Sequence, residues 1–196
     1  MTRRSLTWLL LILVLVSGAL ISLGVGDGDL SDPVLRDTFL RLRTWRTANS
    51  MLAGAALAIG GVMVQGLFRN PLASPSILGT TAGASLGGII VLLLWNGILM
   101  GALPDWMPSE MVLPIGCLFG AWVSLVILLT VTGRQPGVVT VLLTGFILSA
   151  FFLSIAGLLT SMAQETWELG RAVVAFTLGG VESKGPRHVA LALPMV

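Results

Sequence analysis

Few side chains in this sequence are suited to chemistry, and their spacing excludes most kinds of catalytic site. His188 is the only histidine and Cys117 the only cysteine, so the chain cannot build a zinc cluster or a disulfide framework of its own. The serines and threonines of the apolar stretches have no base nearby to activate them. The glycine-rich segment 79–88 lacks the Lys-Ser or Lys-Thr pair of a phosphate-binding loop. We therefore predict no catalytic residue, cofactor or metal site, and any ATP would bind to a separate subunit.

Ionisable side chains are also missing from five long stretches of the sequence: 5–26, 47–68, 70–104, 111–133 and 135–164. Ion-driven transporters and pumps place such groups inside the membrane as proton relays or coordination sites. Their absence indicates that any transport is passive, or is powered from outside these segments.

The composition indicates a membrane protein. Hydrophobic residues make up 55% of the 196 residues, 24 more are glycine, and charged residues account for 10%. A soluble domain has about 25% charged residues, so this chain has too little polar surface for a water-soluble globule. The composition excludes a cytosolic enzyme and a disordered chain, and a net charge of +2 gives no reason to expect a nucleic-acid partner.

The uncharged stretches have the length of membrane-spanning helices, which need about 20 mostly apolar residues. We expect an all-α transmembrane helix bundle in the lipid bilayer, with spans at 6–23, 47–68, 79–100, 111–132 and 138–161 and the start of a sixth at 188. Residues 1–196 would form a single, C-terminally incomplete domain. Alternatively, the first span is a signal peptide cleaved near residues 17–19. Apolar residues that continue to Leu23 favour a retained helix.

Positive charges near the span ends predict the orientation of the chain. Four of them agree on a cytoplasmic N-terminus: Arg3, Arg4, Arg69 and Arg134. Residues 24–46, 101–110 and 163–187 would then lie outside, and residues 69–78 and 133–137 inside. Within 163–187, residues 165–180 suggest a short helix near the outer surface. The outer segment 24–46 nevertheless carries four arginines, which need a separate explanation: Arg36, Arg41, Arg43 and Arg46.

Small residues at four-residue spacing predict close helix packing. Gly79, Gly83 and Gly87 form a ladder on one helix face, and such faces let two membrane helices approach closely. Structural packing without a role in a transport pathway is the simpler interpretation of each glycine.

One ordered block of sequence resembles a known family. Arg43-Thr-Trp-Arg46 is followed by small residues over 52–61, and then by a Gln-x-x-x-Arg-Asn-Pro-Leu-Ala-x-Pro motif and Leu78-Gly-Thr-Thr-Ala-Gly-Ala84. The motif residues lie at the expected cytoplasmic connection between spans two and three: Gln65, Arg69, Asn70, Pro71, Leu72, Ala73 and Pro75. Together with Phe176-Thr-Leu-Gly-Gly180, the block resembles the FecCD family, the permease subunits of ABC importers for iron–siderophore complexes, haem and vitamin B12. Trp45 departs from the proline usual there.

The resemblance implies a function and a set of partners. Family members have about ten spans and sit in the bacterial or archaeal cytoplasmic membrane. Two permease subunits, identical or different, combine with two ATPase subunits and an extracytoplasmic substrate-binding protein. Iron(III)–siderophore or haem cargo is favoured, with vitamin B12 or another metal chelate as the alternative. A passive or ion-coupled carrier that only looks similar is the competing hypothesis.

The resemblance also suggests roles for particular residues. Arg43 and Arg46 would receive carboxylates of the binding protein, and the alternative is that they anchor a helix end among lipid headgroups. The fifth helix would line the pathway with Thr144, Ser149 and Ser154, for which hydrogen bonding between helices is an equally simple role. The turn with Arg134, Pro136 and Gly137 would sit at the cytoplasmic gate, unless it merely connects two helices.

Overall fold

The computed structural model of the chain describes residues 3–25, 35–95, 108–134, 137–179 and 185–193. Every regular element in these ranges is helical, in agreement with the predicted all-α class. Two compact units divide the chain. The first holds residues 1–56 and 181–196, and the second holds residues 57–180.

The first unit contains α1, the N-terminal part of α2, and α8. Helix α1 covers Arg3–Gly24, α2 covers Arg36–Phe68, and the short α8 covers Pro186–Ala192. Helix α2 begins eleven residues before the span expected at 47–68. The uncharged window marks only the segment that fits inside hydrocarbon, whereas the charged turns before it continue the same helix into the more polar region.

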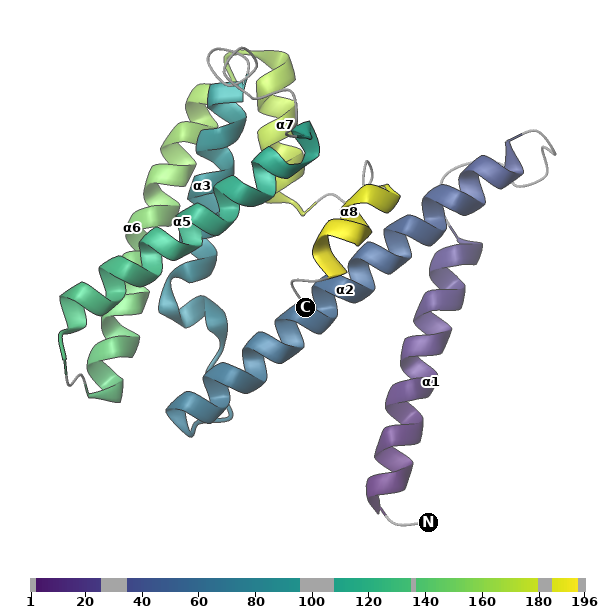
Figure 1. The fold of residues 1–196 in the computed structure, drawn as a ribbon, viewed down its shortest axis with the longest axis horizontal. Helices are drawn as coiled ribbons and strands as arrows, with labels where there is room; N and C mark the ends of the chain where they lie inside the picture. Colours follow the sequence, from purple (N-terminus) through teal and green to yellow (C-terminus); the bar gives the residue numbers. More distant parts are fainter. Residues whose placement is uncertain (1–2, 26–34, 96–107, 135–136, 180–184, 194–196) are drawn as a thin grey trace. The chain divides into compact units, whose positions relative to one another are not determined.

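The second unit holds the C-terminal part of α2 and the remaining helices: η1 (Pro75–Leu78), α3 (Thr80–Leu94), α5 (Ser109–Thr132), α6 (Val138–Ala163) and α7 (Trp167–Thr177). Helix α3 contacts η1, α5, α6 and α7, which surround it in Figure 1. The predicted third span, 79–100, runs past residue 95 and so lies partly outside the described residues.

Glycine and proline set the helix ends in the second unit. Pro75 occupies the first position of η1, where a proline needs no amide donor. Gly79 then takes a positive φ of 79°, which ends η1 and redirects the chain into α3. Helix α5 ends at Gly133, with φ of 75°, and the Gly133 amide donates to the Leu129 carbonyl at 3.3 Å.

The second unit has a small apolar core. Ile89 of α3 and Val173 of α7 are 1% and 0% exposed, and they pack with Ala156 and Ala163 of α6. The pairing of α3 with α5 depends on glycine instead. A Cβ at Gly83 would lie 2.6 Å from the carbonyl oxygen of Gly120, so the two backbones are in direct contact.

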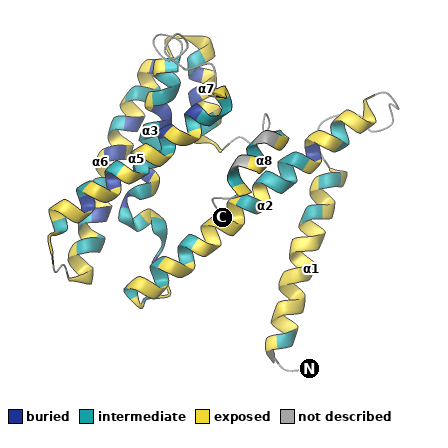
Figure 2. Cartoon of the chain, viewed as in Figure 1, coloured by how far each residue is buried: buried dark blue, intermediate teal, exposed yellow. Residues whose placement is uncertain are grey.

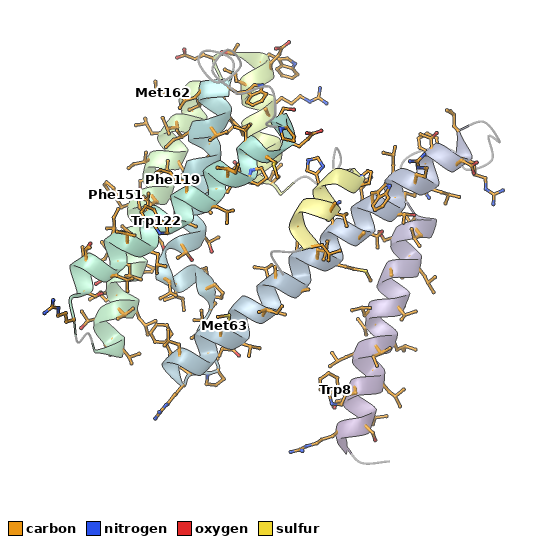
Figure 3. All side chains as sticks on the ribbon, viewed as in Figure 1. Trp8, Met63, Phe119, Trp122, Phe151 and Met162 are labelled. Atoms are coloured by element: carbon orange, nitrogen blue, oxygen red, sulfur yellow. The ribbon has the colours of Figure 1, made fainter. Side chains whose placement is uncertain are left out.

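Most large apolar side chains point outward. Four described helices are long and apolar enough to cross a membrane: α1, α2, α5 and α6. None of the membrane-length window of α1 is buried, and Figure 2 draws this helix as exposed along most of its length. Figure 3 shows Trp8, Phe119, Trp122 and Phe151 on outward faces. Exposed apolar area of this extent suits lipid rather than water.

Candidate functional site

The N-terminal part of α2 places the two predicted docking arginines in different surroundings. Arg43 is only 5% exposed, and its Nη1 donates hydrogen bonds to the carbonyl oxygens of Leu23 at 3.0 Å and Gly24 at 3.2 Å. Arg46, three residues further along the helix, is half-buried. Arg43 therefore faces the end of α1, and Arg46 is the more accessible of the two.

A second polar contact joins α1 and α2 one helical turn below Arg43. The hydroxyls of Ser22 and Thr47 are 2.9 Å apart, and the Thr47 hydroxyl also donates to the Arg43 carbonyl at 2.9 Å. Thr47 Oγ1 is therefore left to accept the hydrogen bond from Ser22. Nothing in the sequence pattern pairs Ser22 with Thr47, because they belong to different helices.

The motif at 65–75 forms a tight turn after α2. The Asn70 amide donates to the Gln65 carbonyl at 3.2 Å, and Arg69 takes a φ of 49°, which is uncommon for a residue with a side chain. Asn70 Oδ1 accepts the Leu72 amide at 2.9 Å, and the Ala73 amide donates to the Asn70 carbonyl at 3.1 Å. An asparagine that binds its own backbone two residues ahead stabilises such a turn.

The motif continues through Pro71 into η1, and Pro75 brings it back against α2. The Pro75 ring lies 3.5 Å from where a Cβ of Gly60 would be. The Gln65–Pro75 motif therefore builds a folded connection that returns to α2 before α3 begins.

Helix α6 crosses η1 at a glycine. A Cβ on Gly145 would overlap the carbonyl oxygen of Ile77 and lie 3.0 Å from the Cα of Leu78. One turn later, Ser149 Oγ is within hydrogen-bonding distance of two carbonyl oxygens, 2.8 Å from that of Gly145 and 3.3 Å from that of Ser76. The contact joins the predicted pathway helix directly to the connection that follows α2.

The other predicted pathway residues differ in exposure. Thr144 is half-buried, whereas Ser154 is exposed and donates to the Ala150 carbonyl of its own helix at 2.8 Å. At the other end of the helix, Gly137 precedes α6 and Arg134 is exposed. Pro136, predicted with them, lies outside the described residues. Among the residues that the structure describes, no three His, Cys, Asp or Glu side chains are grouped so that they could hold a metal ion.

Comparison with known proteins identifies the family. The model of the FecCD transport family matches residues 6–196. The chain belongs to the FecCD transport family.

Two relatives within the family are import permeases. The chain is 31% identical to the molybdate import system permease protein MolB of Haemophilus influenzae, over 86% of this chain and 52% of the relative. It is 38% identical to the vitamin B12 import system permease protein BtuC of Escherichia coli, over 73% of this chain and 43% of the relative. The chain thus spans about half the length of the curated relatives it matches.

A solved structure described as an inward-facing conformation of a metal-chelate type ABC transporter matches the fold with a TM-score of 0.70 and 28% identity. The match covers 92% of this chain and 54% of that chain. This FecCD chain therefore shares the permease fold as well as the sequence family.

Several contact residues in this family member were not predicted as sites. Gly145 has no glycine four residues away in α6, so no ladder marks it. Gly88 receives the ring of Phe176, since a Cβ there would overlap Phe176 Cζ and lie 2.9 Å from Cys117 Sγ. The sequence marks Phe176 only as part of a family motif. Its contact with Gly88 becomes evident only in the folded chain.

Proposed function

We propose that this chain is part of the membrane permease of an ATP-driven (ABC) importer in the cytoplasmic membrane of a bacterium or archaeon. The observation that carries this proposal is the FecCD match over residues 6–196. The import permeases MolB and BtuC among its relatives support the same activity. The sequence has no phosphate-binding loop, so ATP hydrolysis is assigned to separate ATPase subunits.

The proposed substrate is a metal chelate, with iron(III)–siderophore or haem as the first candidates and vitamin B12 as the alternative. A molybdate permease among the relatives adds an oxyanion to the compounds worth testing. The described residues hold no group able to bind a metal, which favours recognition of the cargo as a whole, by the binding protein, over coordination by this chain.

The proposed assembly contains two permease subunits, identical or different, with two ATPase subunits and an extracytoplasmic substrate-binding protein. The proposed topology has a cytoplasmic N-terminus, with the 65–75 connection and the 133–137 turn inside. The exposed Arg134 supports this orientation, because arginines are enriched on the cytoplasmic side.

Helix α6 is the proposed pathway helix. Exposed Ser154 and half-buried Thr144 would offer hydroxyls to a hydrated cargo, whereas Ser149 contacts the η1 backbone. The turn with Arg134, Pro136 and Gly137 is the proposed cytoplasmic gate.

The outer end of α2, with Arg43 and Arg46, is the proposed docking site of the binding protein. Arginine can bind a carboxylate through two parallel hydrogen bonds, which suits an interface with an acidic partner. We expect the double reversal Arg43→Glu with Arg46→Glu, in the complete permease, to slow association with the binding protein and weaken its dependence on salt. Unchanged association at low salt would contradict docking at these arginines and leave lipid anchoring as the alternative for the more accessible Arg46.

The import hypothesis is tested in proteoliposomes that contain the complete permease, its ATPase and its binding protein. Uptake of labelled ferric siderophore, haem, vitamin B12 and molybdate is measured with ATP, without ATP, and with an ionophore that collapses ion gradients. An ABC importer takes up one of them only with ATP and is insensitive to the ionophore. Uptake that needs no ATP, or that the ionophore abolishes, would favour the competing hypothesis of a passive or ion-coupled carrier.

A further inference from the structure

Arg43 is the only charged residue that the described part of the chain buries. It is the one buried residue of α2. Its acceptors, the carbonyls of Leu23 and Gly24, belong to the last turn of α1, which ends at Gly24. Carbonyls of a last turn have no amide four residues ahead within the helix to satisfy them.

The end of α1 is a favourable place for this guanidinium. The aligned peptide dipoles of a helix leave a partial negative charge at its C-terminal end, and a cation there is stabilised. A buried charge needs hydrogen-bonding partners, and the two carbonyls provide them to one Nη1 atom. Arg43 thus has a role within the protein itself, which offers a reason for a positive charge in a segment expected outside.

Side-chain packing contributes little to holding α1 against α2, so polar contacts between the two helices contribute more to their association. None of the membrane-length window of α1 is buried, and lipid supplies no hydrophobic drive between helices. The bond between Ser22 and Thr47 lies next to the Arg43 contacts on both helices. Residues 22–24 of α1 therefore meet Arg43 and Thr47 of α2 in one compact polar contact, which we call the α1–α2 clamp.

We propose that Arg43 is a positioning residue that fastens the C-terminal end of α1 to α2, and that Arg46 carries the docking contact of this pair. The positioning role of Arg43 is inferred from the geometry of the clamp alone. The docking role of Arg46 rests on the proposed import function and on the greater accessibility of Arg46.

The clamp is tested by cross-linking in the complete permease in its native membrane. Ser22→Cys and Thr47→Cys are introduced together in a permease from which Cys117 and any other cysteine have been removed, and the rate of disulfide formation under mild oxidant is followed by the loss of maleimide-reactive thiols. Arg43→Met is then added, because methionine keeps an apolar stem, inserts readily into lipid and removes every donor. We expect cross-linking to be at least about tenfold slower, because losing one hydrogen bond to a charged group already corresponds to about that factor and Arg43 makes two such bonds to α1.

Two matched variants separate the clamp from a general effect of removing an arginine. Arg46→Met lies one turn away and should leave the cross-linking rate unchanged. Arg43→Lys keeps a cation that can donate to the carbonyls, so it should restore much of the rate lost in Arg43→Met. Equal cross-linking rates with and without the Arg43→Met change, or equal slowing by Arg46→Met, would overturn the clamp.

Binding measurements test the docking role of Arg46 separately. Association of the binding protein with the complete permease is measured at low and moderate salt for Arg46→Glu and for Arg43→Lys. We expect Arg46→Glu to weaken association and its salt dependence, and Arg43→Lys to leave both near wild type. If Arg46→Glu has no effect while the cross-linking results hold, docking at this site is wrong and the clamp stands.

Discussion

At the scale of single residues, glycine determines how closely the helices of the second unit approach. A Cβ on Gly87 would overlap the Gly116 carbonyl oxygen and lie 3.0 Å from the Cα of Gly120. Helices α3 and α5 therefore meet through backbone atoms. In lipid, where helices gain nothing from leaving water, such close contact supplies much of the attraction between them.

Replacing Gly87 with valine should separate α3 from α5. The branched side chain would have to displace backbone rather than a flexible side-chain end, so we expect a loss of roughly 1–3 kcal/mol in the free energy of unfolding. Thermal unfolding of the complete protein in mild detergent measures this as a lower midpoint. Gly157→Val on α6 is the matched control, since a Cβ there meets nothing within 4 Å. Equal shifts for both variants would contradict the packing role of Gly87.

The sequence predicts some residue roles and leaves others undetermined. The spacing of Gly83 and Gly87 marks a packing face of α3, because residues four apart lie on one side of a helix. Gly79, predicted to share that face, instead caps α3 with a positive φ and lies outside the helix. The spacing does not say which helix packs on that face. The burial of Arg43 is still less predictable, because it depends on where the last turn of α1 lies in space. Local patterns indicate a surface, whereas the partner of that surface depends on the tertiary fold.

At the scale of elements, α7 contacts α3 through an aromatic side chain seated on a glycine and through a buried valine in the core. Phe176 near the end of α7 fills the space that a Gly88 side chain would occupy, and Cys117 of α5 borders the same position. Val173, one turn earlier, is fully buried against the core of α3 and α6. Helix α7, with 11 residues, is too short to span a bilayer and is held by these contacts.

A double-mutant cycle tests the attachment of α7. Gly88→Ala alone should destabilise the complete protein, because its methyl group would overlap the Phe176 ring. In a Phe176→Ala background the same change should cost less, since the ring is gone, and the two effects should differ by about 0.5–3 kcal/mol. Thermal midpoints of the four proteins in detergent give the coupling. Strict additivity would contradict a direct contact between the two residues.

Apolar length predicts helix positions better than helix ends. It locates α1, α5 and α6 closely, because the bilayer imposes nearly the same length on every span. The charge-free window places the start of α2 at residue 47 rather than Arg36, since such windows record burial in lipid and not helicity. The contact between α6 and η1 at Gly145 is not predictable in this way, because no glycine lies four residues from Gly145 to mark a packing face.

At the scale of the whole molecule, the described helices have the exposed apolar surface that is typical of a protein embedded in a lipid bilayer. Four described helices have membrane length, and most of their large apolar side chains are exposed. The buried core is small, and polar contacts such as the α1–α2 clamp and the Ser149 contact with Ser76 join elements that are distant in the sequence. A protein of this kind depends on the bilayer to orient its helices, so its topology is its most basic testable property.

The proposed topology predicts which positions a membrane-impermeant maleimide can reach in intact cells. Single cysteines replace Asp29, Asp105 and Arg134, each in a complete protein from which Cys117 and any other cysteine have been removed. Positions 29 and 105 should react from outside. Position 134 should react only after the membrane is permeabilised, because Arg134 is exposed in the turn between α5 and α6 and marks the cytoplasmic side by its charge. Cysteine replacing Leu13, within the apolar α1, serves as a control for lipid shielding and should react slowly in both conditions. Reaction at position 134 in intact cells would invert the topology, and it would place the arginines of α2 on the cytoplasmic side, where no extracytoplasmic binding protein can reach them.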